Sequence, residues 1–257
     1  MAASSSQLLF FFLLLLPLAI NGADFITLKC EANFTGNAIL QGNINTLLLD
    51  LEAKTSARGF ANSSRGAGND TVYGISECRE DATAEKCAAC MAEAVLQAYT
   101  SCPNSAESYV WHHSCFLRYA NREFFGQADS GRVGAWSSTV KAADPPTFAR
   151  AVVELLDVVG IEASYGEYRK FGWGELDTGR SYHVPKLYGM AECTWDLRQQ
   201  ACINCLLDAY KLFREDCGDR VGCVVMTKSC SLRFDVDAFL FLNGRSSPAS
   251  SVTAGHL

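Results

Sequence analysis

The chain has 257 residues, of which 49% are hydrophobic and 19% are charged, and its formal net charge is -6. Such a composition is typical of a globular protein and excludes a disordered one. The acidic balance argues against nucleic acid or an anionic membrane as a partner, because both attract clusters of Lys and Arg.

The first residues of the chain differ from the rest. Leu8 to Ile20 is apolar, interrupted only by Pro17, and the small residues Gly22 and Ala23 follow. This layout predicts a secretory signal peptide over residues 1–23. The apolar run is shorter than the roughly 20 residues of a membrane-spanning helix. We therefore expect no membrane span and a protein secreted to the extracellular space.

Three N-glycosylation sequons agree with this route. They begin at Asn33, Asn62 and Asn69, all in the first half of the chain. Because glycans attach to surface positions of secreted proteins, the sequons predict that one side of the molecule carries sugar.

The cysteines indicate a tandem duplication. Those from Cys78 to Cys115 recur 115 residues later, from Cys193 to Cys230, and Tyr73-Gly74 recurs as Tyr188-Gly189. The repeat predicts two modules, over residues 24–136 and 146–243, joined by a linker over 137–145 and followed by a polar tail over 244–257. The same offset pairs Cys30 with Pro145, and it pairs Ser108 with Cys223.

Each repeat is predicted to contain a first helix, a short stranded region with the Tyr-Gly segment, a second helix and further short strands. Thr46 to Leu51 belongs to a first helix, with Phe148 to Val159 as its counterpart, and Thr83 is the expected N-cap of the second helix. Apolar spacing places the second helices over Cys87 to Ala98 and Cys202 to Phe213. Strands are expected over Tyr109–Trp111, Cys115–Tyr119 and Cys230–Phe234. The fold class is α+β, with two disulfide-stapled modules that each pack two helices on an antiparallel β-sheet.

The cysteines allow three interpretations, namely disulfides, zinc binding or a redox dithiol. Zinc would need a second ligand pair in the module, and the adjacent His112 and His113 point to opposite faces of a strand. A redox site needs a thioredoxin-like setting, which neither repeat has. An even cysteine count in a secreted chain favours disulfides, and we expect no metal and no other cofactor.

The unmatched cysteines suggest a compensating exchange between the modules. Its simplest form pairs Cys30 with Cys102 in the first repeat and Cys217 with Cys223 in the second. The longer loop would stabilise its module by about 4.4 kcal/mol and the shorter loop by about 2.4 kcal/mol. The second module should therefore be held less tightly, by about 2 kcal/mol.

These motifs resemble a known plant family. Two copies of Cys-x8-Cys-x2-Cys, with Tyr-Gly ahead of the first cysteine and the aromatic strand Phe116-Leu117-Arg118-Tyr119, resemble the ginkbilobin-homologous or stress-antifungal domain of cysteine-rich repeat secretory proteins. The resemblance implies the pairs Cys30–Cys102, Cys78–Cys87, Cys90–Cys115, Cys193–Cys202, Cys205–Cys230 and Cys217–Cys223.

The resemblance also implies a function. It suggests a secreted apoplastic binding protein of plant defence or stress signalling, with an extracellular protein or a cell-wall or fungal glycan as its partner. The founding member binds mannose through an Asn, an Arg and a Glu. The matching positions hold Glu31, Tyr109 and Ala120 in the first repeat, and Pro146, Val224 and Asp235 in the second. Only Asp235 keeps the family's charge, so it alone is carried over as a candidate ligand residue.

An enzyme is not expected. The sequence contains neither the Gly-x-Ser-x-Gly elbow of hydrolases nor the His-Glu-x-x-His motif of zinc proteases. The alternative function is modulation of receptor-like kinase ectodomains through protein contacts without sugar binding. Because aromatic residues are enriched at interface hot spots, Tyr168 and Trp173 are candidate contacts on a loop specific to the second repeat. The equivalent residues Arg118 and Arg233 either support the fold or bind an anion or sugar.

Overall fold

The computed structural model of the chain describes residues 25–165, 170–178, 186–241 and 252–253. The expected signal peptide, Tyr168 and the expected polar tail other than Val252–Thr253 lie outside these residues. None of the helices in the described part of the chain is long and apolar enough to cross a membrane.

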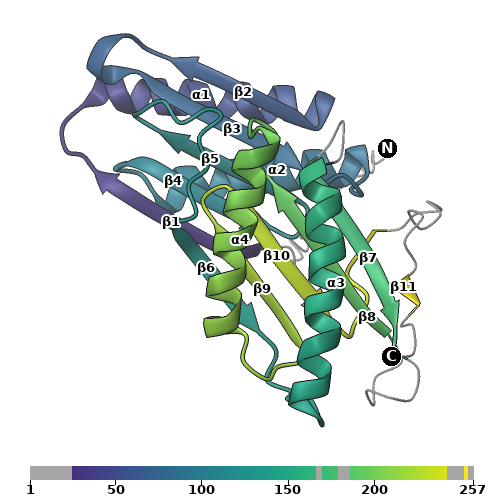
Figure 1. Cartoon of the computed structure of the whole chain (residues 1–257). Coiled ribbons are helices and arrows are strands. Elements are labelled where there is room, and N and C mark those ends of the chain that lie inside the picture. Colours follow the sequence, from purple (N-terminus) through teal and green to yellow (C-terminus); the bar gives the residue numbers. More distant parts are fainter. Residues whose placement is uncertain (1–24, 166–169, 179–185, 242–251, 254–257) are drawn as a thin grey trace, which may run out of the picture.

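The first module is an antiparallel sheet with two helices on one face (Figure 1). Its elements are β1 (Phe25–Asn33), α1 (Ala38–Arg58), β2 (Phe60–Arg65), the 3-10 turn η1 (Gly68–Asp70), β3 (Val72–Cys78), α2 (Ala84–Ser101), β4 (Ser105–His112) and β5 (Cys115–Ala120). The strand order is β1-β4-β5-β3-β2. The side chain of Thr83 accepts a hydrogen bond from the Lys86 amide, so the predicted N-cap is confirmed.

The second module repeats this arrangement. Its elements are β6 (Arg132–Ser137), α3 (Pro145–Tyr165), β7 (Phe171–Asp177), β8 (Lys186–Cys193), α4 (Gln199–Asp216), β9 (Gly222–Thr227), β10 (Cys230–Asp235) and β11 (Val252–Thr253). The strand order is β11-β7-β8-β10-β9-β6, antiparallel except for the pairing of β11 with β7. The α+β prediction of two modules is confirmed.

The strand β6 corrects the expected boundary between the modules. It was expected to lie in the first module, ending at residue 136, but it pairs with β9 in the second sheet. Ser137 lies opposite Cys223, as Cys30 lies opposite Ser108. The structural counterpart of Cys30 is therefore Ser137 and not Pro145. The offset is 107 at β6 and 108 in the core of α3, because the second module has one extra residue between β6 and α3 and seven extra residues between the core of α3 and Cys193.

The expected linker also ends earlier than predicted. Pro145 and Pro146 form the start of α3, which we had expected to begin near Phe148. Proline is well tolerated in the first turn of a helix, where its missing N–H would have no helical partner. The side chain of Asp144 accepts a hydrogen bond from the Thr147 amide at 3.3 Å, which caps this turn.

Trp173 lies in β7 and not in a loop. Phe171 pairs with Glu192 in β8, as Phe60 pairs with Glu77 in β3. The stretch therefore does have a match in the first repeat, which the sequence did not reveal because the offset changes again. Gly172 faces α3, and a Cβ there would lie 2.0 Å from the carbonyl oxygen of Val159. This position needs glycine because strand and helix approach so closely.

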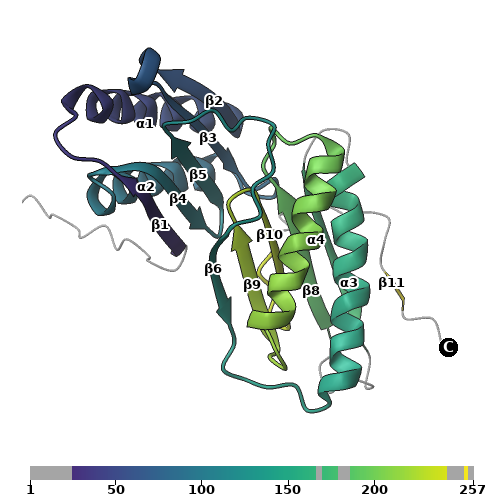
Figure 2. The ribbon, with the colours of Figure 1, turned by 60° about the vertical axis from the view of Figure 1, so that its left-hand side comes forward.

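Six disulfides fasten the helices to the sheets. They join Cys30–Cys102, Cys78–Cys87, Cys90–Cys115, Cys193–Cys202, Cys205–Cys230 and Cys217–Cys223. Among the described residues no cysteine is free. Each module has its own apolar core between its helices and one face of its sheet. The helix pairs lie on opposite sides of the molecule with the two sheets between them (Figure 2).

Candidate functional site

The two sheets meet through their inner faces. A shared apolar cluster joins them, consisting of Ile75, Tyr109, Trp111, Phe116, Ala120, Phe124, Val224 and Met226. The indole N–H of Trp111 donates a hydrogen bond to the carbonyl oxygen of Thr227 at 3.0 Å. The aromatic residues of this cluster are thus buried against the other module of the same chain.

Equivalent residues make reciprocal contacts across this interface. The amide of Gly126 donates to the Asp196 carboxylate at 2.7 Å, and the amide of Phe241, 115 residues later, donates to the Asp81 carboxylate at 2.8 Å. Because Asp81 and Asp196 are themselves repeat equivalents, the modules are related by approximate twofold symmetry.

The two equivalent arginines, Arg118 and Arg233, also make matching contacts across the interface. The guanidinium of Arg118 lies 3.9 Å from the centre of the Phe124 ring, and that of Arg233 lies 3.9 Å from the centre of the Phe239 ring. Arg118 donates to the carbonyl oxygen of Lys228, whereas Arg233 contacts Nδ1 of His113. Both arginines therefore hold the modules together, which favours the structural role for them.

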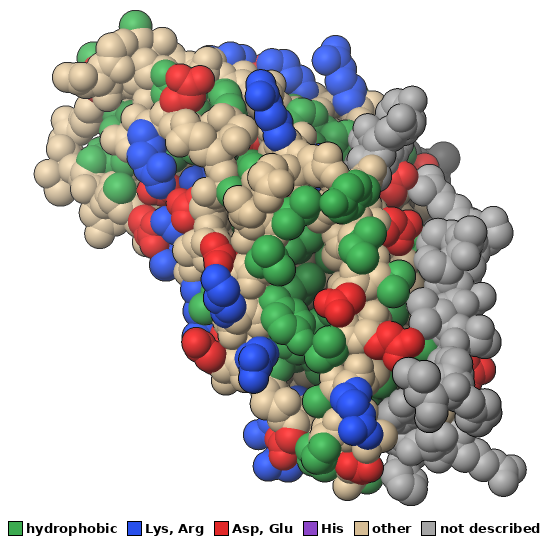
Figure 3. Space-filling view, in the orientation of Figure 1, with side chains coloured by type: hydrophobic (Ala, Val, Ile, Leu, Met, Phe, Trp, Pro, Cys, Tyr) green, Lys and Arg blue, Asp and Glu red, His purple; other side chains and the backbone are tan. Residues whose placement is uncertain are grey.

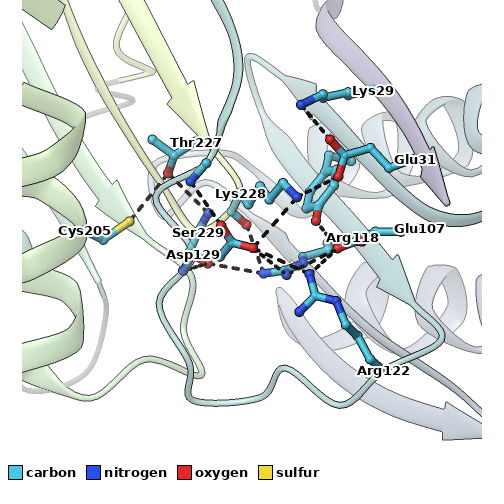
Figure 4. Close-up of polar contacts among 12 residues, drawn as sticks. Lys29, Glu31, Glu107, Arg118, Arg122, Asp129, Cys205, Thr227, Lys228 and Ser229 are labelled. Carbon is cyan, nitrogen blue, oxygen red and sulfur yellow. Dashed lines mark hydrogen bonds and ion pairs between the residues drawn. The ribbon is translucent and has the colours of Figure 1, made fainter. Parts of the chain in front are cut away.

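The first position of the family's sugar site is occupied by an ion-pair cluster (Figure 4). The carboxylate of Glu31 lies 2.6 Å from Nζ of Lys29 and 2.6 Å from Nζ of Lys228. Lys228 belongs to the turn between β9 and β10 of the other module. Burial of Glu31 opposes ionisation, but the hydrogen bonds from the two lysines prevail and lower its pKa.

The other two positions of the first repeat are buried. Tyr109 and Ala120 have no exposed surface. The Tyr109 hydroxyl donates to Glu107, whose carboxylate also lies 2.9 Å from Arg122 and 3.7 Å from Arg118. Desolvation raises the pKa of Tyr109, so its hydroxyl stays protonated. Side chains of the chain itself thus fill the space around the family's sugar positions.

In the second repeat two of the three matching positions, Val224 and Asp235, are buried as well. Val224 lies in the shared apolar cluster. Asp235 is only 8% exposed, lies 3.7 Å from Arg233 and accepts a hydrogen bond from the Asp237 amide. By strand pairing, the first position of this repeat, the equivalent of Glu31, is Ser138 and not Pro146. Asp235, expected as a candidate ligand residue, therefore supports the interface instead of facing solvent.

Comparisons with known proteins agree with this architecture. The sequence pattern described as "Salt stress response/antifungal" matches residues 29–122 and 137–237. The chain belongs to this stress-antifungal family. It is 30% identical to cysteine-rich repeat secretory protein 38 of Arabidopsis thaliana over 84% of this chain and 86% of that protein. It is also 30% identical to the antimicrobial ginkbilobin-2-like protein of Castanea crenata over 86% of this chain and 91% of that protein.

Solved structures of the family share the fold. The tandem DUF26 ectodomain of the Arabidopsis thaliana cysteine-rich receptor-like protein PDLP8 aligns with a TM-score of 0.70 at 24% identity, covering 83% of this chain and 98% of that one. The ectodomain of PDLP5 aligns with a TM-score of 0.65 at 27% identity, covering 83% of this chain and all of that one. The arrangement of tandem modules is thus one that this stress-antifungal family uses.

A second charged cluster lies deeper in the interface of this stress-antifungal protein. Glu77 accepts a hydrogen bond from the Trp195 amide, and its repeat equivalent Glu192 accepts one from the Ser231 hydroxyl. Desolvation raises the pKa of both carboxyls, that of Glu77 well above its usual range. The two cavities beside them measure about 10 Å³ each. Such a volume admits at most one water molecule, so no small ligand fits here.

Some residues of the interface were not predicted from the sequence. Lys228 and Asp129 join the ion-pair cluster, yet neither belongs to a motif. Of the predicted ligand residues, Asp235 and Trp173 do not come together, because they lie on different strands and Trp173 is a half-buried residue of β7. A signal was available in the run Cys223 to Met226, where consecutive apolar residues indicate a strand covered on both faces.

Proposed function

We propose that this chain is a secreted, non-catalytic binding protein of plant stress or defence that recognises another extracellular protein. The expected signal peptide and the family membership support secretion to the apoplast. The names of its relatives, which include a secretory protein, an antimicrobial protein and cysteine-rich receptor-like protein kinase 29, support a role at the cell exterior.

One observation carries the choice of a protein over a sugar. Nζ of Lys228 lies 2.6 Å from the carboxylate of Glu31, and this contact joins the second module to the first position of the family's mannose site. A sugar at that place would have to displace a partly buried ion pair, in which the side chain of Lys228 is 13% exposed and that of Glu31 is 27% exposed, and separating such charges leaves each without its partner. Recognition therefore falls to the outer surfaces of the molecule.

The sequons suggest which outer surface is open. Asn33, Asn62 and Asn69 are exposed, and all lie in the first module. Glycans at these positions would cover parts of the first module and leave the helices of the second module accessible. We propose extracellular domains of receptor-like kinases as the partner class, because cysteine-rich receptor-like kinases share this domain pair.

Biosensor measurements on the mature glycosylated protein test this function. Tandem DUF26 ectodomains of receptor-like kinases are offered as protein ligands, and mannose and manno-oligosaccharides as sugar ligands. We expect saturable binding of at least one ectodomain with a Kd of about 1 μM or tighter, and no saturation by the sugars at millimolar concentration. Saturable sugar binding without ectodomain binding would overturn the proposal, as would turnover of a glycan in the same samples.

A further inference from the structure

A groove runs along the outer face of the second module. Its walls are α3 and α4, and its floor includes Leu232 and Phe234 of β10. It consists of two halves of about 590 Å³ and 670 Å³ that share Val153, Asp157 and Tyr210. We call it the α3–α4 groove.

The α3–α4 groove is strongly apolar. Among its lining side chains, Ile161 is 61% exposed, Tyr165 63% and Leu207 58%. Figure 3 shows hydrophobic side chains gathered between α4 and α3, with acidic side chains along the α3 side. Contiguous apolar surface of this kind on a folded protein indicates an interaction site.

Acidic residues border the groove without an ion-pair partner. Glu154 and Asp157 line its α3 wall, and within the described part of the chain neither forms a salt bridge. Asp157 lies close enough to Tyr210 to help burial raise the pKa of that phenol. The other charged lining residues, Arg150, Arg214, Asp219 and Arg220, belong to the half of the groove at the start of α3, whereas in the other half Asp157 is the one charged lining residue. The acidic pair at the middle of α3 favours a partner that places Lys or Arg opposite it.

The first module lacks an equivalent groove of this size. The buried residues Leu48, Leu51 and Thr55 of α1 match Leu156, Val159 and Ala163 of α3. In this register Glu52 takes the place of Gly160.

The site between α1 and α2 encloses only about 280 Å³ and has Glu52 in its lining. In α3 a Cβ on Gly160 would meet no heavy atom within 4 Å. The absent side chain thus helps to open the groove in the second module.

The walls restrict the backbone that can enter. The backbone groups in the interiors of α3 and α4 are used within the helices, so an extended peptide would find no partners for its own N–H and C=O groups. Unpaired backbone groups in an apolar groove are costly. A helix satisfies them internally and can present apolar residues at i, i+3, i+4 and i+7.

We propose that the α3–α4 groove binds an amphipathic helix of the extracellular partner, with its apolar face against Leu206 and Leu232 and its basic residues opposite Glu154 and Asp157. This proposal rests on the proposed protein-binding function. It assigns that function to the second module, which is free of sequons.

A labelled synthetic helix tests the groove. The probe carries leucine at i, i+3, i+4 and i+7 and lysine along its flanks, and a second probe carries glutamate in place of lysine. We expect the lysine probe to bind the full secreted chain with a Kd in the micromolar range, and the glutamate probe to bind at least about tenfold more weakly. Absence of lysine-probe binding, or equal binding of both probes, would overturn the proposal.

The variant Gly160→Leu locates the binding. The new side chain would enter the open space of the groove, so we expect at least a tenfold loss of lysine-probe binding. The Tm should be unchanged or higher, because a glycine is removed from a helix interior. Gly42→Leu is the matched control, since Gly42 of α1 also has no heavy atom within 4 Å of an added Cβ, and its binding should equal that of the unaltered protein.

Other outcomes separate this proposal from the proposed function. Unchanged probe binding by Gly160→Leu would overturn the groove assignment. If that variant still bound a receptor ectodomain as tightly as the unaltered chain, the protein-binding function would stand but the groove would not be its site. A dimer of the free chain that Gly160→Leu dissociates would show that a second copy, and not a partner helix, occupies the groove.

Discussion

The hydroxyl of Ser108 lies 3.4 Å from Sγ of Cys102. In the second module the equivalent residues, Cys223 and Cys217, are joined by a disulfide. The end of α2 is therefore next to β4, where an alternative bridge could form. Cys102 instead reaches across to Cys30 in β1.

This proximity predicts that the first module can adopt the bridge of the second. Cys30→Ala alone should lower the free energy of unfolding by about 4.4 kcal/mol in the chain-entropy description. Adding Ser108→Cys should form a bridge between position 108 and Cys102 and restore about 2.4 kcal/mol. Denaturant unfolding and peptide mapping without reduction check this. A free thiol at Cys102 in the double variant would contradict it.

The stability of the protein should rise on mild acidification. Folded Glu77 and Glu192 retain protons that the unfolded chain releases above the ordinary pKa of 4.5. The free energy of unfolding therefore falls as the pH rises above about 4.5 and through the raised pKa values of the two folded carboxyls. Below about 4.5 the trend reverses, because Glu31 and Asp50 have lowered pKa values and lose their ion pairs on protonation.

Thermal unfolding from pH 4 to pH 8 measures this dependence. Glu77→Gln should raise the Tm at pH 8 by a few degrees and flatten the profile, because glutamine keeps an acceptor for the Trp195 amide and never ionises. The exposed Glu123→Gln serves as the control and should leave the profile unchanged. A profile for Glu77→Gln that matches the unaltered protein would refute the role of this carboxyl.

Two arginines beside Glu107 should differ sharply in their contribution to stability. The side chain of Arg118 is 2% exposed and that of Arg122 is 52% exposed. Arg118→Met leaves buried Glu107 poorly compensated and should cost about 3 kcal/mol or more. Arg122→Met should cost less than about 1 kcal/mol. Equal losses in denaturant unfolding would be inconsistent with Arg118 holding the modules together.

A glycine pair tests the packing of α3 against β7. Gly172→Ala places a methyl group 2.0 Å from the Val159 carbonyl oxygen and should destabilise the protein at the upper end of the roughly 1–3 kcal/mol typical of overpacking. Gly42→Ala in α1 meets no neighbour and should stabilise it by about 1 kcal/mol. Chemical unfolding of both variants decides the point, and tolerance of Gly172→Ala would contradict the close approach.

Much of the fold could be predicted because the repeat is local and periodic. The five cysteines from Cys78 to Cys115 and their copies predicted two modules, and the apolar spacing predicted the helices. The constant offset of 115 does not hold for the residues that precede Cys78 and Cys193, because insertions in the second module change it. Neither the sequence of β6 nor that of β7 alternates regularly between apolar and polar residues, so their place in the second sheet depends on pairing with distant strands.

The site was less accessible from the sequence. Glu31 and Tyr109 were singled out through the family resemblance, but the filling of their surroundings by Lys228 depends on how two inner faces stack. The contact between Lys228 and Glu31 joins residues 197 positions apart in the chain, so it follows from the three-dimensional packing of the two sheets. The groove likewise depends on a missing side chain at Gly160, and a single helical glycine carries no specific signal.

The reciprocal hydrogen bonds of Asp81 and Asp196 join the two modules in the way that two subunits of a symmetric dimer are joined, but here both belong to one polypeptide. A pair of separate subunits falls apart on dilution, whereas two halves on one polypeptide keep a fixed effective concentration. The paired state therefore persists however scarce the protein is. Expressing either half alone would bare its inner sheet face, and such a fragment should self-associate or precipitate.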